Sequence, residues 1–154
     1  MTGFVPSPAA AGPAGTASGV LQLEMARQLA RYPGGVQTTA TQISYDGGRF
    51  VIDYAPPSGE VSLLGTPNCP VDWVCFYDLD NYGYPRGKLR DCGWQDLGTW
   101  GWRNRLNSVH NNHDYTAIFT DEDLWEAVDV SRKSANPNMG VVRNRADTIY
   151  INCG

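Results

Sequence analysis

Hydrophobic residues recur at helical spacing between residues 19 and 32, where they form a single stripe: Leu21, Met25, Leu29 and Tyr32. Ser18 is a suitable N-cap for this helix, and Pro33-Gly34-Gly35 would end it. The stripe is of ordinary hydrophobicity and the opposite face is only weakly basic, so we expect the helix to pack on the rest of the domain. Docking to a partner or to a membrane is the alternative.

Alternating positions next predict a β-hairpin with strands at Thr39–Tyr45 and Arg49–Tyr54. The turn between them, Asp46-Gly47-Gly48, supplies glycines that accept positive φ angles. Proline and glycine then break the alternation. We therefore expect residues 55–68 to form a connector with a short strand at Val61–Leu64.

From residue 69 onward, aromatic residues and turn signals alternate, which is typical of short β-strands. A turn at residues 111–114 divides this region into two units, and Asn136-Pro137-Asn138 interrupts the second unit. The predicted strands are Trp73–Asp78, Lys88–Cys92, Ser108–Asn111, Tyr115–Thr120, Ala127–Val130 and Thr148–Asn152.

One sequence pattern occurs twice, at residues 102–109 and again at residues 142–149. Its shared skeleton is Arg-Asn-Arg-x-(Asn/Asp)-(Ser/Thr)-(Val/Ile). Each copy closes a segment that opens with an aromatic-acidic strand, so we infer one supersecondary unit used twice. Two copies are too few for a solenoid. Two four-stranded units packed face to face would instead make a small β-sandwich.

The composition fits a mainly β protein rich in turns: the 154-residue chain contains 17 Gly, 10 Pro, 8 Tyr and 5 Trp, with only 18% charged residues. The net charge is −4 and the basic residues are scattered, so we expect no nucleic-acid partner. No apolar run reaches the length of about eighteen residues that a membrane-spanning helix needs.

The division into segments follows from local composition. Residues 1–17 are mostly Ala, Gly, Pro, Ser and Thr, which cannot bury enough apolar area to offset their ordering entropy. We predict a flexible tail there. Residues 18–68 would carry the helix, the hairpin and the connector, and residues 69–154 would form the repeated β domain.

Four cysteines are present: Cys69, Cys75, Cys92 and Cys153. Their spacing shows no paired knuckle of the kind that binds zinc, so disulfides are the better interpretation and imply an oxidising compartment. Three pairings are possible, and we favour Cys69–Cys75 with Cys92–Cys153. The longer loop would contribute about 4 kcal/mol in the chain-entropy model.

An oxidising compartment normally requires export, but residues 1–8 show neither a basic segment nor a long apolar segment of a signal peptide. Either the signal has been removed or the protein leaves the cell by another route, and in both cases we expect a secreted, extracellular protein. A virion or another released particle is the alternative.

Three motifs carry a family resemblance: Cys69-Pro70-x4-Cys75-x-Tyr77-Asp78-x2-Asn81-Tyr82-Gly83, then Cys92-Gly93-Trp94-Gln95-x-Leu97, then Asn104-x3-Ser108-Val109-x-Asn111-Asn112. Residues 69–153 resemble the actinobacterial peptidase inhibitor family I36, which is similar to the βγ-crystallins. The resemblance implies a double Greek-key β-sandwich. Residues 19–54 resemble extensions that precede such domains in secreted actinobacterial proteins.

The chain departs from the crystallin pattern in both folded hairpins, where a glycine normally takes up an unfavourable φ angle. Tyr84 stands at that position in the first unit, and Gly83 and Gly87 would relocate the turn. Ala127 stands at the corresponding position in the second unit.

Many crystallin-type domains bind calcium through two Asn/Asp residues, two free positions, then Ser/Thr and Ser. Here Arg105 and Arg145 replace one oxygen donor in each repeat, and a guanidinium opposes a cation. We therefore expect no cofactor, and we disfavour calcium. The acidic run at residues 121–123 more simply caps its hairpin. The weak calcium candidates are Asp78, Ser108, Asp121 and Thr148.

No catalytic residue is predicted, because no hydrolase motif is present and the only histidines, His110 and His113, lie in a turn. A carboxylate pair for glycoside cleavage stays open, although no pair has a recognisable setting. We expect a protein that is not an enzyme.

Aromatic residues are dense between residues 73 and 102, and core packing explains most of them. We expect Trp73 and Trp94 in the core, together with one of the two tryptophans that follow. Glycines flank Trp100, so we expect it to be exposed on a mobile loop. The interaction candidates are Tyr82, Tyr84, Trp100 and Trp102.

Two functions stay open. The resemblance implies a secreted peptidase inhibitor that fills the cleft of an extracellular metallopeptidase with a rigid loop. The alternative is a structural or binding module attached to a cell surface, a carbohydrate or a particle. Asp80–Lys88 and Leu97–Asn104 are the candidate inhibitory loops because they are rich in Gly and aromatic residues. The sequence does not determine the oligomeric state.

Overall fold

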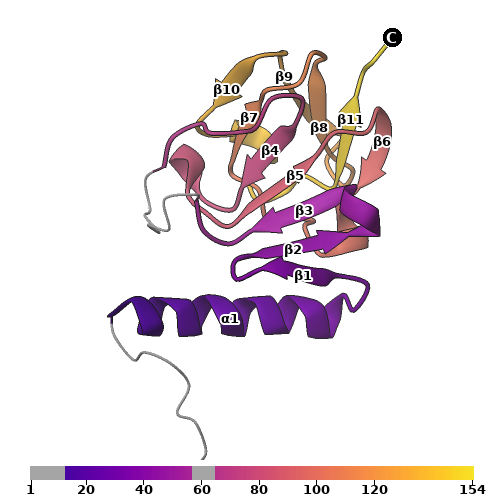
Figure 1. Cartoon of the computed structure of the whole chain (residues 1–154). Helices are drawn as coiled ribbons and strands as arrows, with labels where there is room; N and C mark the ends of the chain where they lie inside the picture. Colours follow the sequence, from indigo (N-terminus) through magenta and orange to yellow (C-terminus); the bar gives the residue numbers. More distant parts are fainter. Residues whose placement is uncertain (1–12, 57–64) are drawn as a thin grey trace, which may run out of the picture.

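The fold is a two-layered β-sandwich with one helix beside it (Figure 1). The computed structural model describes residues 13–56 and 65–154. Helix α1 spans Pro13–Arg31. The strands are β1 Val36–Thr39, β2 Gln42–Tyr45, β3 Phe50–Asp53, β4 Val74–Tyr77, β5 Arg86–Leu89, β6 Gly93–Asp96, β7 Ser108–Asn111, β8 Ala117–Asp121, β9 Glu126–Val130, β10 Ser134–Asn136 and β11 Thr148–Ile151.

Strand order shows two interlocked Greek keys. The first unit, β4–β7, sends its third strand β6 into the sheet of the second unit, β8–β11, which sends β10 back into the first sheet. One sheet therefore has the order β1-β2-β3-β5-β4-β7-β10 and the other has the order β6-β11-β8-β9, all antiparallel. This confirms the predicted mainly β, double Greek-key sandwich.

All six strands predicted after residue 69 are present, with ends that move by up to three residues. Strands β1, β6 and β10 were not predicted. The polar sequence of β10 and the Gly-Trp-Gln-Asp sequence of β6 carry too little alternation to mark a strand. The predicted strand at Val61–Leu64 lies outside the described residues.

The helix begins at Pro13 rather than at residue 19, so Ser18 lies within it and the prediction of a flexible tail is wrong for residues 13–17. Proline is tolerated in the first turn of a helix, and the alanines that accompany it favour helix. The predicted stripe does pack on the domain through Met25, which is fully buried, and partly buried Leu29. Within the described residues, no helix is long and apolar enough to cross a membrane.

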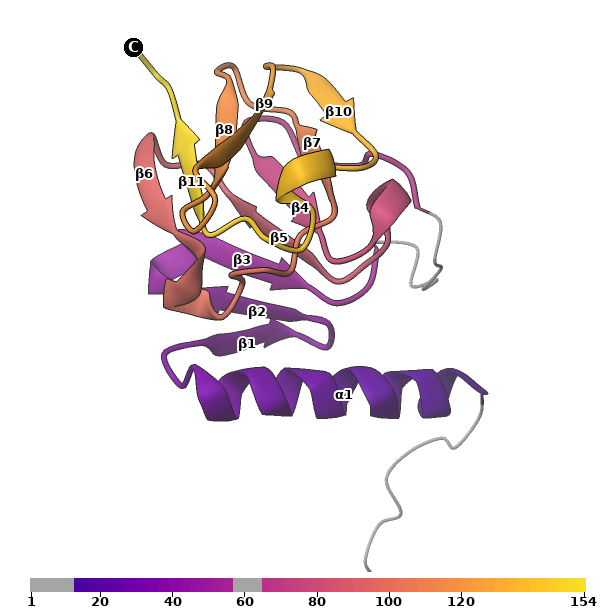
Figure 2. The same ribbon diagram turned by 180° about the vertical axis from the view of Figure 1, so that it is seen from behind.

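The helix and hairpin are continuous with the sandwich. Strand β3 pairs along its whole length with β5, an outer strand of the first Greek key, and α1 lies alongside β1 and β2 (Figures 1 and 2). Phe50 of β3 packs between Trp100 and Phe76, with ring centroids 4.5 and 6.0 Å away. The extension and the repeated region therefore share one hydrophobic core.

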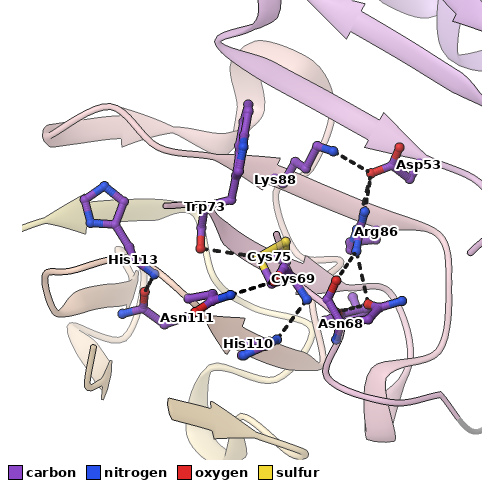
Figure 3. The surroundings of a disulfide bond; sticks show 12 residues. Asp53, Asn68, Cys69, Trp73, Cys75, Arg86, Lys88, His110, Asn111 and His113 are labelled. Carbon is purple, nitrogen blue, oxygen red and sulfur yellow. Dashed lines mark hydrogen bonds and ion pairs between the residues drawn. A yellow bond between two sulfur atoms is a disulfide. The ribbon is translucent and has the colours of Figure 1, made fainter. Parts of the chain in front are cut away.

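A buried ion pair crosses this β3–β5 seam. The Arg86 guanidinium donates to Asp53 Oδ2 at 2.7 Å and to Asn68 Oδ1 at 3.0 Å, and both charged residues are less than 10% exposed (Figure 3). Gln42 donates to the second Asp53 oxygen at 2.7 Å. Burial alone would raise the pKa of Asp53, but Arg86, Gln42 and Lys88 outweigh it and hold the pKa below its ordinary value.

The seam gives a prediction for Asp53→Asn, which should lower the free energy of unfolding at pH 7 by about 3–5 kcal/mol because Arg86 loses its buried partner. The pKa of Asp53 is lower in the folded protein than its ordinary value of 3.8. Ionised Asp53 therefore stabilises the fold at pH values above 3.8, and this stabilisation is lost as the pH falls through the pKa of the folded state. Urea unfolding of the wild type should therefore lose more stability between pH 7 and pH 3 than the variant does.

The matched control is Asp91→Asn, which breaks the exposed pair with Arg49 and should cost no more than about 1 kcal/mol. An equal acid-induced loss in Asp53→Asn and the wild type would contradict this assignment.

Candidate functional site

Two disulfides tie the repeated region together with the pairing favoured from the sequence, Cys69–Cys75 and Cys92–Cys153. The paired Cα atoms lie 5.6 and 5.7 Å apart, and no cysteine is free. The second bond joins the start of β6 to the chain just after β11. Such bonds persist in oxidising compartments, which suits an extracellular environment.

The short disulfide braces a surface loop (Figure 3). The Cys69 backbone N–H donates to Nδ1 of His110 at 2.9 Å, and Val71 projects from the loop with 67% of its surface exposed. Burial, helped by the charges of Arg86 and Lys133, lowers the pKa of His110. The ring is therefore neutral at pH 7, and its Nδ1 accepts the hydrogen bond from the Cys69 N–H.

The other histidine also serves the backbone. His113 Nδ1 accepts from the Tyr115 N–H at 3.2 Å, so its Nε2 donates to the Arg90 carbonyl at 3.0 Å. His110 lies in β7 rather than in the predicted turn, and both histidines use their ring nitrogens to hold backbone groups.

The two copies of the duplicated pattern hold the two units together through equivalent, reciprocal contacts. Asn104 and Asn144, its equivalent residues, both adopt left-handed φ angles, of 60° and 57°, which Asn tolerates better than most residues. The Asn104 N–H donates to the Ala146 carbonyl, and the Asn144 N–H donates to the Leu106 carbonyl, each at 3.0 Å. The repeat is therefore a reciprocal clasp between units.

The first arginine of each copy reaches the folded hairpin of the opposite unit. Arg143 bonds Asp80 at 2.8 Å, and Arg103 lies 3.6 Å from Glu122 while holding Asp96 at 2.8 Å. These exposed pairs orient the hairpins more than they stabilise them.

The second arginine of the first copy pairs with a carboxylate of its own unit. Arg105 forms two bonds to the Asp78 carboxylate, at 3.2 and 3.3 Å, and lies 4.3 Å from the centre of the Trp102 ring. Its guanidinium therefore engages the carboxylate of Asp78, one of the weak calcium candidates, and the absence of calcium stays a prediction.

Ser108 fixes the first folded hairpin through its hydroxyl group. Its hydroxyl accepts from the Tyr82 N–H at 2.9 Å and donates to the Leu79 carbonyl at 2.7 Å. The turn does not relocate to Gly83 as predicted, because Asn81 and Tyr82 themselves take positive φ angles of 53° and 62°. These hydrogen bonds stabilise the strained backbone.

The second repeat gathers carboxylates instead. Oxygens of Asp121, Asp123 and Asp147 lie within 4.8 Å of one another, and the hydroxyls of Thr120 and Thr148 contact each other nearby. Asp147 accepts from the Glu122 N–H at 3.0 Å, so it also caps the hairpin. The sequence singled out Asp121 and Thr148 but not Asp147, which corresponds to the neutral Asn107 of the first copy.

The predicted interaction residues are mostly buried, which corrects our expectation for Trp100. Its exposed fraction is 4%, because the ring stacks on Phe50 and its Nε1 donates to Asp46 at 3.1 Å. Gln28 of α1 also bonds its carbonyl at 2.7 Å. Trp102 is fully buried and Tyr84 is 7% exposed, so only half-buried Tyr82 could reach a partner.

Trp94 lies on the surface rather than in the core, which is a second correction. It is 65% exposed on β6 and stacks on Tyr150 of the neighbouring β11, with ring centroids 4.8 Å apart. Trp125, in the turn between β8 and β9, is 90% exposed. A hollow of about 220 Å³ joins Trp94 and Trp125; its other walls are Thr120, Asp121, Glu122, Glu126, Ala127 and Thr148. We call this hollow the tryptophan pocket.

A further hollow of about 420 Å³ lies between α1 and the first unit. Arg27 and Arg31 line one side, but Glu24 and the internally paired Asp78 and Arg105 line it too. Its mixed charge selects no ligand class.

No protein-family model matches the chain, and no curated protein matches it. Solved structures do resemble it. A structure from a study of the evolution of the eye lens βγ-crystallin domain fold is 15% identical, with a TM-score of 0.48, and covers 57% of this chain and 93% of its own. A βγ-crystallin domain from Flavobacterium johnsoniae is 18% identical, with a TM-score of 0.40, and the match covers 51% of this chain and 92% of that domain. A βγ-crystallin from Ciona intestinalis is 13% identical, with a TM-score of 0.44, and the match covers 52% of this chain and 99% of that protein. Membership of family I36 stays a prediction.

Ser108→Ala should lower the free energy of unfolding by about 1–3 kcal/mol, because the Tyr82 N–H and the Leu79 carbonyl lose their partner. The loss should be equal in EDTA and in calcium, since the hydroxyl serves the backbone. Thermal unfolding measures it, with Ser134→Ala as the control at a more exposed hydroxyl that bonds only one carbonyl. A calcium-dependent stabilisation of the wild type that Ser108→Ala removes would contradict this role.

Proposed function

We propose that this chain is a non-catalytic extracellular binding module whose recognition surface is the outer face of the β6-β11-β8-β9 sheet. The observation that carries the proposal is the exposure of two tryptophans on that face, 65% for Trp94 and 90% for Trp125. Exposed tryptophan is unusual in a monomeric soluble surface and is enriched at binding sites. Figure 2 shows the four strands that form this sheet.

The exposed ring of Trp94 is held in place before any partner binds. Tyr150 stacks on Trp94 and limits its motion, so little side-chain entropy is left to lose on binding. The exposed fractions of Trp94 and Trp125 show that no other part of the described chain covers these two rings.

Both disulfides support an extracellular location for the proposed module, and the bracing roles of His110 and His113 support the absence of catalysis. The proposal includes no resident metal, since Arg105 pairs with Asp78 in the first repeat.

A peptidase inhibitor remains the second candidate, and one observation favours it. The Cys69–Cys75 disulfide braces a loop that exposes Val71, and a rigid loop with an apolar tip could fill a metallopeptidase cleft. The loop Leu97–Asn104 is less suited, because Leu97, Trp100 and Trp102 are buried. Titration of a thermolysin-like peptidase tests this candidate: Val71→Asp should abolish inhibition, and the absence of inhibition by the wild type would exclude this enzyme class.

The binding proposal predicts the behaviour of the double variant Trp94→Ala, Trp125→Ala. On arrays of extracellular glycans and peptides, it should lose at least about tenfold in affinity for whatever the wild type binds, since each tryptophan is a candidate hot spot. Its melting temperature should change little because both side chains are exposed.

Val36→Ala is the matched control, because Val36 is 63% exposed on β1 at the far edge of the other sheet. This control should bind as the wild type does. Unchanged binding by the double tryptophan variant would remove the proposed surface from consideration.

A further inference from the structure

We propose that the tryptophan pocket receives a cationic side chain, the ammonium of lysine or the guanidinium of arginine, from a polypeptide partner. This inference rests on the proposed function and names the ligand class of the same surface. Three independent features of the pocket carry it: its aromatic walls, its charge and its size.

Both tryptophans expose ring surface to solvent, although Trp94 also stacks on Tyr150. Trp125 is 90% exposed and has a φ angle of 56°, a left-handed conformation that is unfavourable for a bulky residue. A tryptophan that gains little burial in a strained position points to a role outside the core. Trp94 forms the other wall, and exposed ring faces attract cations.

The rim of the pocket is negatively charged. Asp121, Glu122 and Glu126 line it, and Asp123 and Asp147 adjoin Asp121. In the described part of the chain, four of these five carboxylates have no basic side chain within ion-pair distance. Glu122 alone does, with Arg103 at 3.6 Å. The field at the pocket therefore favours a cation over a neutral or anionic group.

Another tryptophan on this protein already shows the same chemistry. Trp73, on the opposite sheet, has the Lys88 ammonium 5.2 Å and the Arg90 guanidinium 4.7 Å from its ring centre. Neither tryptophan of the pocket has such an internal partner among the described residues. The cation that would complete the pocket must come from another molecule.

The volume of the tryptophan pocket favours a single side chain over a larger ligand. The pocket holds about 220 Å³, below the roughly 300–1,000 Å³ of sites that enclose drug-sized molecules. One long side chain fits this volume, whereas a saccharide chain would need a longer groove. The apolar walls suit the methylene stem of lysine or arginine, and the acidic rim suits its charged end.

The test compares a flexible Gly/Ser peptide carrying lysines at alternate positions with the same peptide in which every lysine is acetylated, which removes the charge and keeps the stem. The indole N–H signals of Trp94 and Trp125 are followed by NMR at fixed ionic strength, with EDTA present. Acetylation should weaken binding by at least about tenfold, and Glu126→Gln should weaken binding of the charged peptide by several-fold.

Asp114→Asn is the matched control, because it makes the same change in net charge at an exposed carboxylate outside the pocket. It should leave the affinity for the charged peptide unchanged. Equal weakening by Asp114→Asn and Glu126→Gln would show general charge attraction and overturn the inference.

Two further outcomes separate this inference from the proposed function. Equal binding of the charged and acetylated peptides, or binding of a neutral chitooligosaccharide in place of the charged peptide with shifts at both indoles, would overturn the cationic ligand and leave the recognition surface intact. If the array ligands also bind equally well to the double tryptophan variant, both the surface and its ligand class fail.

Discussion

The buried contact between the Asp53 carboxylate and the Arg86 guanidinium joins two parts of the chain that lie 33 residues apart in sequence. Without the β3 pairing that it accompanies, β5 would be an outer strand with unpaired backbone groups, a natural site of edge-to-edge association. The same guanidinium holds Asn68, whose amide bonds the hydroxyls of Tyr77 and Tyr84. One buried charge thus orders both the attachment of the hairpin and the interior of the first unit.

The attachment of the hairpin to β5 determines which tryptophans are exposed. The hairpin and α1 bury Trp100 through Phe50, Asp46 and Gln28, so the chain itself covers this ring. No such cover lies over β6 and β11 among the described residues, where Trp94 stays exposed. The pairing of β6 with β11, and of β11 with β8, then places the acidic second hairpin beside that tryptophan. The same packing of the hairpin and α1 that buries Trp100 therefore leaves Trp94 exposed.

The sequence predicted what local patterns and spacing determine: the duplicated unit, the hairpin, most strands and both disulfides. It misplaced Trp94 and Trp100, since exposure depends on which distant segment covers a ring, and residues 97–101 give no sign that the hairpin packs there. It found Asp121 but not Asp147, because the two residues meet only when β11 pairs with β8. It noted Arg105 as an obstacle to calcium, and the structure adds the partner, Asp78. In each case, the environment of the missed residue depends on tertiary contacts that the local sequence does not reveal.

The central claim is that the helix, the hairpin and the sandwich form one cooperative unit joined at the β3–β5 seam. Differential scanning calorimetry of the intact chain tests it most directly, because a shared core cannot melt in parts. We expect a single transition whose calorimetric and van't Hoff enthalpies agree. Two separate transitions, with hydrogen-exchange protection of β1–β3 lost before that of β4–β11, would contradict the claim.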